Sequence, residues 1–178
     1  MTEPQDSLSP MERQGALLQD LARVLLTSVD LTEQWQKLTA AFIPDGEGWA
    51  GRIVVTDLDD SSSGGDARFA TDSQITLLLD AMQQASAEHA SAQHAAARAG
   101  TEPAPDQAAG PFVSLRLDAE RTGEDRDRIA LASDLNYDRD PGSFDGVGGV
   151  DQQVARHFVE RFGADAAPAW MRELLPAH

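Results

Sequence analysis

The chain has 178 residues, with 30 acidic and 14 basic side chains, a formal net charge of -16 and no cysteine. The absence of cysteine excludes disulfides, thiolate nucleophiles and Cys-ligated zinc sites. The negative charge disfavours direct binding to nucleic acid or anionic lipid and favours basic protein surfaces, although plain solubility explains it equally well. Neither a signal peptide nor a run of 18 apolar residues is found, so we expect a cytoplasmic protein.

The first predicted element is an amphipathic helix. Residues 1–8 are polar and unpatterned, and they predict a disordered arm. Ser9 to Glu12 form a capping box with Pro10 at the first helical position. The helix is expected to reach about Thr27, because apolar residues recur behind the cap at steps of three and four: Leu17, Leu18, Leu21, Val24 and Leu25.

The middle of the chain predicts a hairpin and a second helix. Residues 34–42 and 49–58 read as paired strands around a Pro-Asp-Gly turn, and residues 67–70 as a short third strand. Asp72 or Ser73 caps a helix expected to run to about Ala90. Alanine and proline then dominate, which predicts a flexible segment from about residue 91 to 110.

The last third predicts a second hairpin, from residues 111–118 and 128–136, followed by helices at residues 150–162 and 168–175. The order of the elements lacks strict strand-helix alternation, and the strand spacing favours antiparallel pairing. The expected fold is therefore a single α+β domain over residues 9–178. It consists of an antiparallel sheet of four to five strands with helices on one side, an N-terminal helix and two C-terminal helices.

The densest polar segment runs from Asp134 to Asp145 and overlaps the spacing of a calcium loop. Arg139 replaces the glycine of the sharp turn, and the last ligand is Asp instead of Glu, so a turn whose polar side chains bond nearby amides is favoured. A small metal-binding domain or an enzyme using this loop stays open as the alternative. No catalytic motif is recognisable, and we expect no enzyme activity, no cofactor and no metal.

The same segment has the composition of a protein-recognition surface, because aromatic and arginine anchors surrounded by charge are typical of interfaces. Two further acid-rich segments, residues 57–66 and 120–127, are expected to lie near it at the ends of the sheet and to form a continuous negative surface. The candidate partner-binding residues are Asp134, Tyr137, Asp138, Arg139, Asp140, Phe144, Asp145, Asp59 and Asp60.

Two motifs in the C-terminal region resemble the YezG-like immunity proteins. Tyr137, Asp138 and Pro141 match the Tyr-Asp-x-x-Pro turn of that family, and Arg161-Phe162 followed by Pro168-Ala169-Trp170 is similar to its basic-aromatic step and Pro-x-Trp helix. The resemblance implies an antitoxin without chemistry of its own, which binds a cognate secreted toxin domain, a nuclease being one such toxin. An adaptor in a secretion locus is the other binding function left open, and a monomer is favoured over a homo-oligomer.

Overall fold

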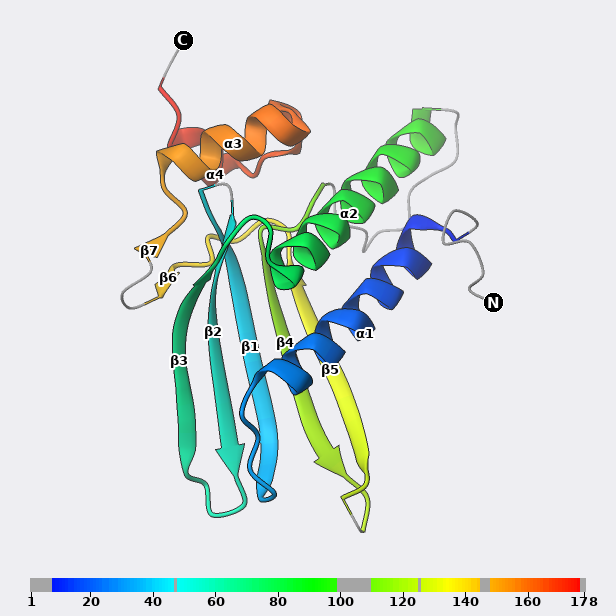
Figure 1. Cartoon of the computed structure of the whole chain (residues 1–178). Coiled ribbons are helices and arrows are strands. Elements are labelled where there is room, and N and C mark those ends of the chain that lie inside the picture. Colours follow the sequence, from blue (N-terminus) through cyan, green and yellow to red (C-terminus); the bar gives the residue numbers. More distant parts are fainter. Residues whose placement is uncertain (1–7, 47, 99–109, 125, 145–147, 177–178) are drawn as a thin grey trace.

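The computed structural model describes residues 8–46, 48–98, 110–124, 126–144 and 148–176 (Figure 1). The predicted arm at residues 1–8 lies outside them except for Leu8. The first helix, α1 (Pro10–Ser28), begins as predicted: the Glu12 amide donates to Ser9 Oγ at 3.3 Å, and the Ser9 amide donates to Glu12 Oε2 at 2.9 Å. This reciprocal pair satisfies two amides that a helix start leaves without partners.

A five-stranded antiparallel sheet forms the centre of the fold, in the order β3-β2-β1-β4-β5. Both predicted hairpins are confirmed. The third strand is longer than predicted because the Ser- and Gly-rich stretch before residue 67, expected as a loop, pairs along β2. The strands are β1 (Trp35–Asp45), β2 (Gly48–Asp57), β3 (Ser62–Phe69), β4 (Ser114–Thr122) and β5 (Arg128–Asn136).

Two helices cover one face of this sheet, and no helix covers the other face (Figure 1). They are α1 and α2 (Gln74–Arg98), which lie side by side. Because alternate residues of a strand point to opposite faces, only one set from each strand meets the helices. The main core between them is fully buried and includes Leu21, Leu25, Leu38, Phe42, Leu79, Met82, Leu115 and Leu117. The α+β fold expected from the sequence is therefore confirmed.

Helix α2 is longer than the sequence indicated. The sequence indicated an end near Ala90, followed by a flexible segment, but residues 91–98 are helical. Alanine-rich sequence has high intrinsic helix propensity, so the helix continues after its last buried residue, Ala90. The rest of the predicted flexible segment, up to residue 109, lies outside the described residues.

The C-terminal helices form a second, smaller core at one end of the sheet. Helices α3 (Gln152–Phe162) and α4 (Ala169–Glu173) flank a short 3-10 turn, η2 (Ala164–Ala166). They pack on Val113 before β4, at the end of the sheet, and not on its open face. A two-stranded ribbon, β6 (Ser143–Phe144) and β7 (Gly148–Gly149), precedes them.

Among the described residues, no helix is long and apolar enough to span a membrane.

Candidate functional site

The open face of the sheet, opposite α1 and α2, is uncovered over most of its length. Its side chains come from the strand positions that alternate with the core, as shown by the registers Lys37–Glu120, Thr39–Asp118 and Ala41–Arg116. β1 has 11 residues, so the face is about 35 Å long, and five strands make it about 20 Å wide. An area of roughly 700 Å² is close to the ~800 Å² that a stable protein interface buries on each partner.

Ion pairs organise the middle of this open face. Asp118 accepts from Thr39 Oγ1 at 2.6 Å and from Arg116 Nε at 3.0 Å, and Lys37 Nζ lies 3.3 Å from it. Burial opposes its ionisation, but these hydrogen bonds outweigh burial and hold the pKa of Asp118 below its ordinary value. Arg52 and Asp66 form a second pair, with two parallel contacts at 2.6 and 2.9 Å. The charged groups are thereby held in place before any partner arrives.

A groove of about 280 Å³ lies where the open face meets the segment after β5. Its floor is formed by strands β1, β4 and β5, and its wall by residues 139–144. Phe144 packs over Ile43 and Ala50 on this face, with the Arg52 guanidinium 5.5 Å from the centre of its ring. The predicted site residues Asp134, Arg139, Asp140 and Phe144 are therefore brought together here.

Asn136 holds the wall of the groove in shape. Its amide nitrogen donates to Ser114 Oγ at 3.0 Å and to the Arg139 carbonyl at 2.7 Å, and its oxygen accepts from the Arg139 amide at 3.0 Å. Asp140 accepts from the Gly142 amide at 2.9 Å. The interpretation of this segment as a turn whose polar side chains bond nearby amides is confirmed.

Replacing Asn136 by alanine removes three hydrogen bonds from a side chain that is 8 % exposed. We expect Asn136→Ala to lower the free energy of unfolding by about 1–3 kcal/mol, because the Arg139 backbone groups lose their partners. Asn136→Asp retains the acceptor for the Arg139 amide but places a carboxylate oxygen where the amide nitrogen donates to the Arg139 carbonyl, so it should cost at least as much. Urea unfolding measures both. An aspartate variant as stable as the wild type would contradict this role of the amide.

Tyr137 does not present its side chain as the sequence suggested, whereas the side chain of Asp138 is exposed as expected. Tyr137 is half-buried and packs against the main core, so it is not the free apolar anchor that was predicted. Asp138 is exposed, and its backbone carbonyl accepts from Trp170 Nε1 at 2.8 Å, which fastens α4 to the loop. Asp145 lies outside the described residues.

The acidic segments do not merge into one patch, which corrects the sequence-based expectation. The turns that carry Asp59, Asp60, Glu124 and Asp127 lie at one end of the sheet, whereas the Asp134 segment lies at the opposite end (Figure 1). The reason is topological: β5 leads from the first end to the second. The acidic end, as we name it here, comprises Asp57, Asp59, Asp60, Glu120, Glu124 and Asp127.

Asp59 and its neighbour Leu58 place an ionised carboxylate beside an exposed apolar side chain at the acidic end. Hydrogen bonds from Ser61, including its amide at 3.0 Å, lower the pKa of Asp59, so this carboxylate stays ionised at neutral pH. Leu58 is 53 % exposed beside it. Sequence analysis missed Leu58 as a candidate contact, although a leucine directly before two aspartates in a turn indicates an exposed apolar side chain.

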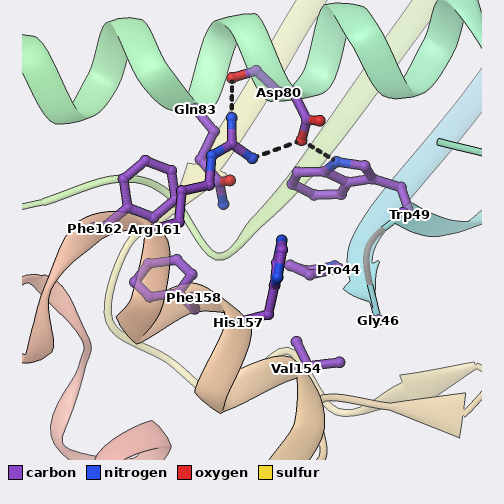
Figure 2. Close-up of a pocket in the computed structure, with 11 residues that line it drawn as sticks. Pro44, Gly46, Trp49, Asp80, Gln83, Val154, His157, Phe158, Arg161 and Phe162 are labelled. Carbon is purple, nitrogen blue, oxygen red and sulfur yellow. Dashed lines mark hydrogen bonds and ion pairs between the residues drawn. The ribbon is translucent and has the colours of Figure 1, made fainter. Parts of the chain in front are cut away.

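A second cleft lies between the β1–β2 turn, α2 and α3 (Figure 2). Asp80 is its centre: one oxygen accepts from Trp49 Nε1 at 3.0 Å and from an Arg161 nitrogen at 2.9 Å, and the Asp80 carbonyl accepts from Arg161 at 3.2 Å. His157 lines the cleft beside Pro44. The space is about 20 Å³, which suits about one water molecule and no substrate. We interpret this cleft as a structural junction.

Sequence analysis also missed Asp80. The signal was present, because Asp80 is the only charged residue of α2 before Glu88 and stands in an otherwise apolar and amide-rich stretch. A lone carboxylate at such a position requires partners, and Trp49 and Arg161 provide them.

Within the described ranges, no group of three or more histidine, aspartate or glutamate side chains is arranged to hold a metal ion. No protein-family model and no curated protein matches the chain. The open face and the groove are therefore the features from which a function can be inferred.

Proposed function

We propose that the chain is an immunity protein that binds a cognate toxin domain over the open face of its sheet and so neutralises the toxin. The observation that carries the proposal is that most of one face of a five-stranded sheet is left uncovered, with acidic loops at both ends. The proposal requires no chemistry, and it places the protein in the cytoplasm, where the toxin would act.

The charge distribution supports a basic partner. The middle of the face carries neutralised pairs such as Arg52–Asp66 and Lys37–Asp118, whereas its two ends carry exposed carboxylates, including Asp59, Asp60 and Asp138. A partner with a basic cleft, as a nuclease has for its nucleic acid, complements such a pattern, and binding then blocks the cleft. Rapid association that weakens with salt is the expected behaviour.

The experiment pairs the purified chain with its candidate toxin, the product of a gene adjacent to its own, and measures Kd by calorimetry at two salt concentrations. We expect a complex that weakens as salt increases. Asp59→Asn with Asp60→Asn should weaken it by about tenfold, since two desolvated charge contacts are lost, and should reduce the salt dependence. Asparagine keeps the acceptor for the Ser61 amide and tolerates the positive φ of residue 60.

The matched control makes the same change in net charge on helices, by Asp20→Asn with Glu160→Gln. This control should alter Kd by less than about twofold, because long-range steering mainly changes the rate of association. An equal effect of both double variants would show that total charge, and not the acidic end, is responsible. The absence of any complex would overturn the proposed function itself.

A further inference from the structure

The two edges of the sheet differ in how they are protected. The β3 edge contains Gly64, whose φ is +131°, next to Gly65, and charged residues follow. Such irregular, glycine-rich edges resist pairing with another strand. The β5 edge instead pairs with β4 in unbroken register over nine residues and contains no glycine, proline or lysine. In the part of the chain that the structure describes, no strand covers its outer side.

Apolar side chains accompany the free β5 edge on the helix-covered face. Ile129 is 46 % exposed and Leu131 is 41 % exposed. They form one wall of a groove of about 350 Å³ whose other wall is α1, with Ala22 and Leu26. Helix α1 therefore leaves this edge incompletely covered, and an exposed, regular, apolar edge strand is a template for adding a further strand.

The sequence of β5 is complementary to itself. If two copies of the strand pair antiparallel about a two-fold axis at Leu131, Arg128 of each copy lies opposite Asp134 of the other, and Ala130 lies opposite Ala132. Arg128 has no ion-pair partner among the described residues, and Asp134 has only a loose contact with Arg139 at 3.7 Å. Both charged side chains belong to the open face, and Ile129 and Leu131 to the other face. Over residues 128–134, where the two strands overlap, every cross-strand pair is then either opposite in charge or apolar, except Ile129 with Ser133.

We infer that the chain forms a homodimer through antiparallel pairing of β5 with its symmetry mate, centred on Leu131. This arrangement joins two five-stranded sheets into one continuous sheet and keeps both open faces on the same side, because the two-fold axis is perpendicular to the sheet. It goes beyond the proposed function and does not rest on it. It differs from the monomer expected from the sequence, because the opposite charges of the two β5 edges attract each other.

The test is sedimentation equilibrium of the full chain in about 0.15 M salt, where repulsion between the two acidic copies is largely screened. We expect a species of twice 19.1 kDa. Arg128→Asp and, separately, Asp134→Arg should each raise the dimer Kd by about 10- to 100-fold, because two attractive pairs become repulsive. The double variant Arg128→Asp with Asp134→Arg restores opposite charges across the axis and should restore the dimer.

Restoration of the dimer by the double variant shows that the edge is occupied by a second copy of this chain. A different partner would keep its own charges and would not bind the charge-swapped edge. Leu131→Lys brings two ammonium groups together on the axis and should give monomers, and circular dichroism checks that it is folded. A monomeric wild-type chain would overturn the inference. A dimer unaffected by Leu131→Lys, or one not restored by the swap, would overturn it as well.

Discussion

Asp80→Ala is expected to lower the free energy of unfolding by about 2–3 kcal/mol. Trp49 is 2 % exposed, and the substitution leaves its indole N–H buried without an acceptor, which accounts for most of the loss. Arg161 also loses its carboxylate partner, so the attachment of α3 to α2 weakens. Thermal and urea unfolding measure the loss, and faster amide exchange in α3 would locate it.

Asp80→Asn is the matched control, since its amide oxygen still accepts from the indole and only the charge is lost. We expect it to cost about 1 kcal/mol, because the Arg161 pair is one-third exposed and solvent screens it. Asparagine and alanine variants of equal stability would contradict the interpretation of Asp80 as the acceptor for Trp49.

Gly51→Ala is expected to destabilise the fold by about 1–3 kcal/mol through overpacking. A Cβ at residue 51 would lie 2.8 Å from Phe42 Cδ1 and 2.8 Å from Phe69 Cε2. These two rings meet over the bare Cα, with centroids 5.8 Å apart and planes inclined at 57°. Since Phe42 is fully buried and both neighbouring strands are held in register, its ring has no free space to move into. The partly buried Phe69 ring can move only by losing this ring contact.

Gly65 on the neighbouring strand gives the comparison. A Cβ there meets no atom within 4 Å and needs no unusual φ, so Gly65→Ala should lie within about 0.5 kcal/mol of the wild type. Urea unfolding of the two variants measures the difference. A loss in Gly65→Ala as large as that in Gly51→Ala would mean that strand flexibility, and not the ring contact, explains the need for glycine.

Local pattern was sufficient to predict the elements. The capping box at Ser9, the turn after Phe42 and the period-two alternation in β4 each depend on residues close in sequence, and the structure confirms them. The errors arose where pairing with a strand distant in the sequence determines the secondary structure. Residues 62–66 form a strand only because β2 offers them a partner, and no local propensity of serine or glycine indicates this.

The site was predictable only in part for the same reason. The turn chemistry of Asn136 and Asp140 follows from residues within three positions, and the sequence indicated it. Whether Tyr137 points inward, and whether Asp59 lies near Asp134, depends on strand order and direction. Neither the contact between Asp80 and Arg161, 81 positions apart, nor the free β5 edge can be derived from spacing along the chain.

Binding over the open face is tested most directly by amide hydrogen exchange of the chain alone and in complex with the same candidate toxin. Binding over the open face predicts slower exchange in residues 137–144 and in the turn at Leu58 to Ser61, with the solvent-facing side of α1 and α2 unchanged. Protection confined to the helices, with both loops exchanging as in the free chain, would contradict the account.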